Sequence, residues 1–193
     1  MRSVAPLVLT VLAALPLAGC RSGGEASNAT SPAPRAARVV TRATPEQQAK
    51  LLDRVKALAG EGNLLDEQGR IEPDSRTVIA VSSNGSVVRE IMMPGGPYEM
   101  TNLYHMDGPN LVVTHYCAMG NQPRMVATPA DAGDDRIHFR FASVSNLTAA
   151  DEECMGDLVL VFLPDGRIRQ EWNSIKNGAV SSHAHFTMVR KAS

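Results

Sequence analysis

Apolar and polar side chains alternate in short runs from about residue 77 to the end of the chain. In one run Ile137, Phe139 and Phe141 share a face, and His138 and Arg140 point the other way. A period of two is typical of half-buried β-strands. The pattern predicts about nine short strands, at residues 77–82, 86–93, 99–106, 111–119, 124–128, 136–142, 157–163, 167–174 and 180–190.

Turn-forming dipeptides separate these runs. Asn84-Gly85, Asp165-Gly166 and Asn177-Gly178 favour tight hairpins, and the stretch 107–110 has similar turn chemistry. Strands joined by tight turns pair with their neighbours in sequence, and closing such a sheet removes its exposed edges. We therefore predict a mainly β fold, an antiparallel up-and-down barrel of lipocalin-like type. In the last strand the same alternation turns Ala184, Phe186 and Met188 inward and leaves His183 and His185 outside or at a rim.

A helical period precedes the strands. Thr44 suits an N-cap and Pro45 suits the first helical position. The apolar stripe that follows consists of Leu51, Leu52, Val55, Leu58 and Ala59. Gly60 and Gly62 are expected to end this helix. A single N-terminal helix is thus predicted, packed on the sheet or capping an open end of the barrel.

The first 20 residues have the order of an export signal. Arg2 precedes an apolar run over 4–17, which is short for a membrane-spanning helix, and small residues lead to Cys20. Leu17-Ala18-Gly19-Cys20 resembles the lipobox of bacterial lipoproteins. That resemblance implies removal of residues 1–19 and acylation of Cys20, so the partner is a membrane reached through the lipid anchor. The alternative is an ordinary signal peptide. Arg21 in place of an aspartate favours the outer membrane, facing the periplasm.

Composition changes after this signal. Residues 20–43 are rich in Ser, Ala, Gly and Pro and are predicted to form a flexible tether, followed by one domain over 44–193. The tether's arginines suit either a solvated linker or attraction to anionic headgroups. From Thr44 onward 14 lysines and arginines face 19 aspartates and glutamates. An acidic domain without a basic patch argues against nucleic acid as a partner.

The densest polar stretch of the chain is 114–125. On its strand Val113, His115, Cys117 and Met119 share a face, and Arg124 begins the next strand. If this face points inward, an imidazole, a thiol and a guanidinium approach one another inside the barrel. A buried arginine needs a partner, for which Glu99, Glu171 or a bound anion are candidates.

These residues also carry a family resemblance. The segments 104–108, Thr114-His115-Tyr116-Cys117 and 120–125, with Glu171-Trp172 and the turn at 176–178, resemble a family of uncharacterised bacterial lipocalin-like (calycin-type) domains. The resemblance implies a β-barrel with an interior ligand site and brings no reaction with it. The family commonly has a histidine pair around a methionine where this chain has Cys154-Met155-Gly156.

Cys117 and Cys154 remain after Cys20 is used by lipid. Two cysteines in an exported protein favour a disulfide. The alternatives are an inert buried thiol at Cys117, or a thiol that shares a metal site with His115.

The function favoured by these observations is a lipid-anchored envelope barrel that binds a small apolar or amphipathic ligand. The predicted ligand contacts are His115, Cys117, Asn121, Gln122, Arg124 and Trp172. A structural lipoprotein with a filled barrel is the alternative. A thiol-dependent enzyme using Cys117 and His115 is less favoured, because residues two apart on a strand need not reach hydrogen-bond distance and no oxyanion motif is visible. Serine hydrolase, P-loop and zinc-protease signatures are absent as well. No catalytic residue, metal or cofactor is assigned, although the five histidines keep haem or metal binding as a further alternative.

Overall fold

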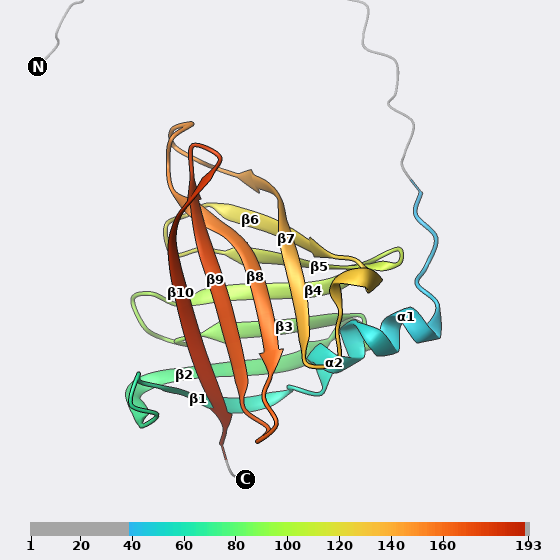
Figure 1. Cartoon of the computed structure of the whole chain (residues 1–193), viewed down its shortest axis with the longest axis horizontal. Coiled ribbons are helices and arrows are strands. Elements are labelled where there is room, and N and C mark those ends of the chain that lie inside the picture. Colours follow the sequence, from blue (N-terminus) through green and yellow to red (C-terminus); the bar gives the residue numbers. More distant parts are fainter. Residues whose placement is uncertain (1–38, 192–193) are drawn as a thin grey trace, which may run out of the picture. The chain divides into compact units, whose positions relative to one another are not determined.

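The computed structural model describes residues 39–191, which form an antiparallel β-barrel of ten strands (Figure 1). Each strand pairs with its neighbour in sequence, and pairing of β1 with β10 closes the barrel. The predicted fold class is therefore confirmed. The signal segment, Cys20 and most of the tether lie outside the described residues. The strands are β1 Gly60–Leu65, β2 Ile71–Ser82, β3 Val87–Met92, β4 Met100–Asp107, β5 Asn110–Tyr116, β6 Gln122–Ala127, β7 Arg136–Ser145, β8 Cys154–Phe162, β9 Ile168–Lys176 and β10 Ala179–Arg190.

The strand missing from the sequence prediction is β1. Gly60 and Gly62 do follow the helical segment, but they open a strand that pairs with both β2 and β10. Strand β2 also begins earlier than predicted, because the polar residues 72–76 hide its alternation. Two short 3-10 turns, Ser83–Gly85 and Pro129–Asp131, complete the secondary structure of the described residues.

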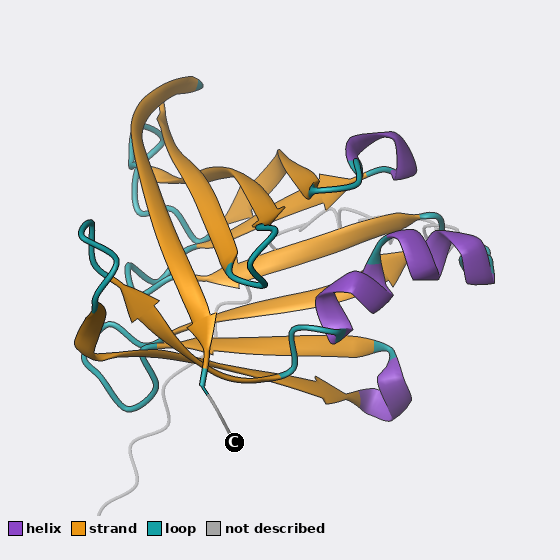
Figure 2. Cartoon of the chain, turned by 60° about the horizontal axis from the view of Figure 1, so that its bottom comes forward, coloured by secondary structure: helices purple, strands orange, loops and turns teal. Residues whose placement is uncertain are grey.

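Two short helices stand where one was predicted, α1 Pro45–Lys50 and α2 Leu52–Lys56. Thr44 forms the expected N-cap, in a reciprocal capping box with Gln47. Leu51 breaks the helix with φ −118° and ψ −85°. The side chains of Leu51, Leu52 and Val55 are nevertheless buried, and the helices lie over one end of the barrel (Figure 2). None of the helices in the described segment is both long and apolar enough to cross a bilayer.

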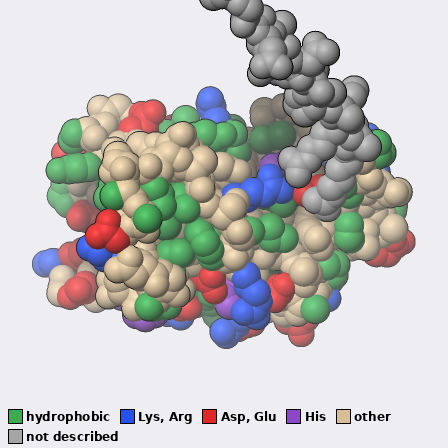
Figure 3. All heavy atoms as spheres, turned by 90° about the horizontal axis from the view of Figure 1, so that it is seen from above, with side chains coloured by type: hydrophobic (Ala, Val, Ile, Leu, Met, Phe, Trp, Pro, Cys, Tyr) green, Lys and Arg blue, Asp and Glu red, His purple; other side chains and the backbone are tan. Residues whose placement is uncertain are grey.

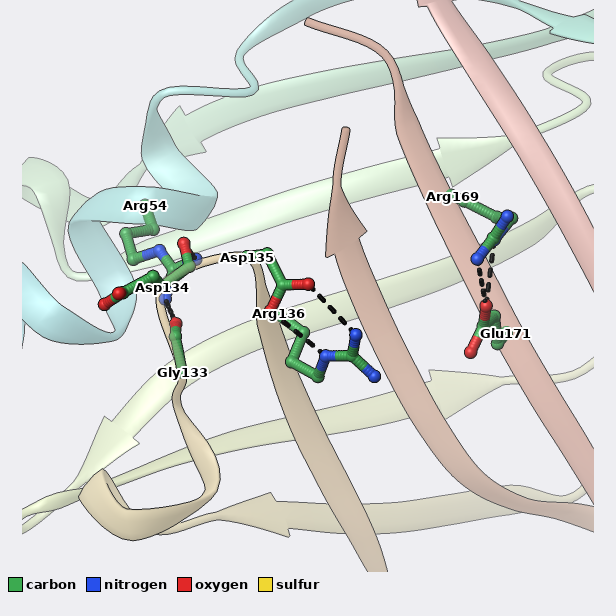
Figure 4. A network of polar contacts seen from close by, with 7 residues as sticks. All are labelled: Arg54, Gly133, Asp134, Asp135, Arg136, Arg169 and Glu171. Atoms are coloured by element: carbon green, nitrogen blue, oxygen red, sulfur yellow. Dashed lines mark hydrogen bonds and ion pairs between the residues drawn. The ribbon is translucent and has the colours of Figure 1, made fainter. Parts of the chain in front are cut away.

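Arg54 fastens this helical cap to the barrel (Figure 4). Its guanidinium donates to the carbonyl oxygens of Gly133 at 2.7 Å and Asp134 at 2.9 Å. It also lies 4.3 Å from the ring centroid of Phe162, in cation–π geometry. The cap is thus held from the loop before β7 and from the end of β8. Figure 4 also shows two ion pairs outside the barrel, Asp135 with Arg136 and Arg169 with Glu171.

The predicted facing of the strands is largely confirmed. Ile137 and Phe139 are fully buried, and His183 and His185 are exposed. Ala184 is exposed as well, although its strand partner Trp172 is buried. On the face seen in Figure 3, acidic and basic side chains are interspersed rather than gathered by sign.

Candidate functional site

Five side chains from four strands meet inside the barrel, and we call them the interior polar ring. Glu90, Asn102 and His115 stand opposite one another across β3, β4 and β5. Gln170 and Trp172 project from β9. All five are at least 93 % shielded from solvent, although each carries a polar group. Buried polar groups of this kind are stable only when hydrogen-bonded, so their partners define what the site can do.

The carboxylate of Glu90 is the hub of the ring. Its Oε2 accepts from Nδ2 of Asn102 at 2.8 Å and from the hydroxyl of Tyr104 at 2.8 Å. Its Oε1 accepts from Nε2 of Gln170 and, at 3.5 Å, from Oγ1 of Thr77. Strands β3 and β9 are not neighbours in the sheet, so the contact with Gln170 crosses the barrel interior. Four donors thus compensate one buried carboxylate.

The same charge acts on Tyr104. Burial first, and then the neighbouring carboxylate of Glu90, raise the pKa of the Tyr104 phenol well above its ordinary value. The phenol therefore keeps its proton and donates it. Tyr104 also contacts Phe139 edge-to-face, with ring centroids 5.9 Å apart.

His115 lies at one side of the interior polar ring. Its Nδ1 lies 2.7 Å from Oδ1 of Asn102, and because Nδ2 of Asn102 donates to Glu90, we assign the proton of this contact to Nδ1. Burial lowers the pKa of His115 to about 4, so the imidazole is neutral at physiological pH. Its ring lies against Trp172, with centroids 5.1 Å apart, and the indole N–H donates to Oε1 of Gln170 at 3.1 Å.

This tautomer leaves the Nε2 of His115 as an acceptor. Among the described residues no hydrogen bond reaches it. The one fully buried side-chain nitrogen or oxygen without a partner in residues 39–191 is Oδ1 of Asn121, so Nε2 of His115 retains some accessible surface. The interior polar ring thus contains one oriented, uncharged acceptor, Nε2 of His115, beside the indole of Trp172.

The structure brings together only part of the predicted ligand set. His115 and Trp172 are in contact, as a shared site requires. Asn121 is fully buried in the β5–β6 turn, where its Nδ2 donates to Glu152 at 3.3 Å. Cys117 is half-buried at the start of the same turn.

Arg124 does not enter the barrel, which corrects the conditional prediction of a buried imidazole, thiol and guanidinium. The buried residues of β6 are Pro123, Met125 and Ala127, so Gln122 and Arg124 point outward by the alternation of the strand. Arg124 pairs with Asp107 at 3.0 Å, not with either glutamate proposed for it. Gln122 donates to the carbonyl of Gly120 at 2.8 Å and accepts from the exposed end of β7 and the loop that follows.

Both cysteines of the described chain carry free thiols. Burial first, and then the neighbouring Glu152, Cys117 and Glu153, raise the pKa of the Cys154 thiol. The Cys117–Cys154 disulfide stays a prediction for the oxidised protein. Within residues 39–191 no three His, Cys, Asp or Glu side chains gather in a way that could hold a metal ion.

The hub of the site was missed from the sequence. Val88, Glu90 and Met92 share one face of β3, so an acidic residue stood at an inward position of an otherwise apolar set. That was the available signal for Glu90. Asn102, Tyr104 and Gln170 gave no comparable signal, because their role depends on which strands face each other across the closed barrel.

Comparisons with protein-family models, curated proteins and solved structures found no match for this chain. The family resemblance carried by residues 104–125 therefore stays a prediction.

Proposed function

We propose that this protein is an envelope lipoprotein, anchored by acyl chains on Cys20, whose barrel binds a small amphipathic ligand beside His115 and Trp172. The address is the outer membrane, with the barrel facing the periplasm. The ligand contributes a hydrogen-bond donor to Nε2 of His115 and apolar surface to the indole.

The observation that carries this proposal is the unpaired acceptor Nε2 on the imidazole of His115, whose orientation is fixed by hydrogen bonds. Asn102 and Glu90 orient His115 through successive hydrogen bonds, and the low pKa keeps its imidazole neutral. A core that only fills space gains nothing from an oriented lone pair without a donor, whereas a binding site needs a few such groups beside an apolar surface. Of the ligand contacts predicted from sequence, His115 and Trp172 are retained, with Cys117 and Asn121 in the turn that follows β5.

The two ends of the barrel differ in a way that suits this site. Residues of both α1 and α2 line one hollow with the β4–β5 turn, so the helical cap lies at the end of the barrel where β5 begins. His115 lies four residues beyond Leu111 on β5, farther from the cap. A ligand would enter from the opposite end, at the loops after β3, β5 and β9. It would stop at the Glu90–Gln170 contact, which closes the interior below it.

Trp172 is the single tryptophan of the chain and so reports on this site directly. We would titrate the full chain in mild detergent with N-phenyl-1-naphthylamine, an amphipathic probe with one N–H donor, and follow energy transfer from Trp172. His115→Phe keeps an aromatic ring but removes the acceptor, and is expected to weaken binding about tenfold. His185→Phe, on the exposed face, is the matched control. Equal affinities in all three proteins, or no energy transfer, would contradict the proposal.

Native mass spectrometry of the chain extracted from its own envelope tests the same site without a chosen probe. We expect a retained small molecule that His115→Phe reduces and His185→Phe does not. The anchor is tested separately with Cys20→Ser, which should release the barrel from membranes into the soluble periplasmic fraction.

A structural lipoprotein with a filled barrel is the second candidate, and one observation favours it. Gln170 reaches Glu90 across the interior, so the middle of the barrel is occupied by protein side chains. Under this alternative His115 and its neighbours brace the barrel, and neither experiment detects a ligand although Cys20→Ser still releases the protein.

A further inference from the structure

Strand β10 has a free edge. It pairs with β9 from Ala179 to Met188, but it pairs with β1 only from Thr187 to Arg190. Within residues 39–191 no strand pairs with the segment Ala179–Phe186 on its other side, and residues 179–185 are exposed. The barrel is therefore closed along one part of β10 and open along the rest, which Figure 1 shows as the upper part of the last strand.

Apart from one irregularity near its tip, this edge lacks the usual protection against pairing. Natural edge strands carry lysines, inward charges or prolines that prevent addition of another strand. The segment Ala179–Phe186 contains no lysine, arginine, aspartate, glutamate or proline, and Val180 is 54 % exposed. One register shift, between Val180 and Ser182, lies near its tip. The unpaired backbone groups beyond that shift can accept a further antiparallel strand.

Opposite charges stand at the two ends of the free edge. At the lower end β1 leaves β10 at Asp66, and the exposed Glu67 follows in the β1–β2 turn. At the upper end the exposed Lys176 is the last residue of β9, directly before the β9–β10 turn. Asp66 pairs with Arg70, whereas no described residue forms an ion pair with Glu67 or Lys176. A surface hollow of about 390 Å³ lies between the β1–β2 turn and residues 183–187.

We propose that this edge pairs with the same edge of a second copy of the chain, as an antiparallel β10–β10 contact. A strand that pairs antiparallel with the free edge lies on the same side of β10 as β1, and begins where β1 stops pairing at Leu65. Pairing centred on His183 keeps inward residues opposite inward residues on the two copies. The β9–β10 turn of each copy then abuts the β1–β2 turn of the other.

The charges explain why the occupant is a second copy. The contact places Lys176 of each copy beside Glu67 of the other. Because the two copies are related by a two-fold axis, this ion pair forms twice. An unrelated extended peptide would have to supply a cation at one end and an anion at the other. Within 179–186 the only titratable side chains are His183 and His185, and the nearest carboxylate, that of Glu153, accepts hydrogen bonds from Ser181 and Ser182.

Charge reversal tests this geometry without disturbing the core. We would measure the mass of the full chain by sedimentation equilibrium in density-matched detergent. The wild-type chain is expected to dimerise. Glu67→Lys and Lys176→Glu should each weaken dimerisation about tenfold, because each places like charges together at both contacts.

A mixture of the two variants provides the decisive arm. When Glu67→Lys meets Lys176→Glu, both contacts again join opposite charges, so the mixture is expected to recover heterodimers at wild-type strength. Glu72→Lys, an exposed change in β2, is the matched control and should leave the mass unchanged. A monomeric wild-type chain, a dimer indifferent to both reversals, or a mixture as weak as its components would each overturn the proposal.

Discussion

Glu90 shows how one residue can decide the interior of a small barrel. An isolated buried carboxylate is costly, but here Asn102, Tyr104, Gln170 and Thr77 all donate to it. These donors come from three strands, β2, β4 and β9, so the carboxylate on β3 also joins strands that are distant in sequence. Burying polar groups in this way stabilises the fold only while every member keeps its partner.

Replacing Glu90 with glutamine should therefore destabilise the protein although the two side chains have the same shape. The amide of Glu90→Gln brings two donors into a place where four donors already converge, so at least one becomes unpaired. We expect a loss of about 2–4 kcal/mol in the free energy of unfolding, measured by urea denaturation. Glu61→Gln, at an exposed position of β1, is the control and should change it by less than about 0.5 kcal/mol. An unchanged Glu90→Gln protein would show that the ring is not an energetic unit.

His115 predicts a defined loss of stability in acid. Its pKa falls from 6.5 to about 4 on folding. Between these two pH values the unfolded chain binds a proton at His115 and the folded protein does not. The stability that this imidazole contributes is complete above pH 6.5 and declines as the pH falls toward 4. The full loss amounts to about 3 kcal/mol.

Urea denaturation between pH 7 and pH 4 measures this effect. Subtracting the profile of His115→Gln, which cannot titrate in this range, from that of the wild-type isolates the contribution of His115. The exposed His183→Gln provides the control and should follow the wild-type. Parallel profiles for wild-type and His115→Gln would mean that His115 is not held neutral by burial.

The elements differ in how far their own sequence determines them. Asn84 and Asn177 adopt positive φ, each followed by a glycine that does the same, and these dipeptides alone place two hairpins correctly. The N-cap of α1 could likewise be predicted from Thr44. Strand β1 could not be predicted in this way, because Gly62 is needed for a close approach to Met188 of β10 that only the closed barrel reveals. The polar ring was hidden for the same reason, since Gln170 and Glu90 are 80 residues apart.

The helical cap depends on its contacts with the barrel, among them those of Arg54, because α1 and α2 are only six and five residues long. Helices this short are unstable without tertiary contacts. Arg54→Met keeps the apolar stem but removes two hydrogen bonds and the cation–π contact, so we expect a loss of about 1–2 kcal/mol. Hydrogen exchange should quicken first at the amides of α2. Arg70→Met removes an exposed ion pair within one turn and should leave α2 unaffected.

At the scale of the whole molecule, closure of the barrel rests on a narrow seam between β1 and β10. Gly62 pairs with Arg190, and a Cβ placed on Gly62 would lie 2.4 Å from Cγ and Sδ of Met188, whose side chain fills that space. Gly62→Val should therefore overpack the seam and cost about 1–3 kcal/mol. Met188→Ala alone should cost about 2–3 kcal/mol by leaving a cavity. If the two side chains compete for one space, the double variant is less destabilised than the sum of the single ones by at least about 1 kcal/mol, measured in a double-mutant cycle. If the free-energy changes of the two single variants simply add in the double variant, other residues of the β1–β10 seam accommodate the valine, and barrel closure does not depend on the contact between Gly62 and Met188.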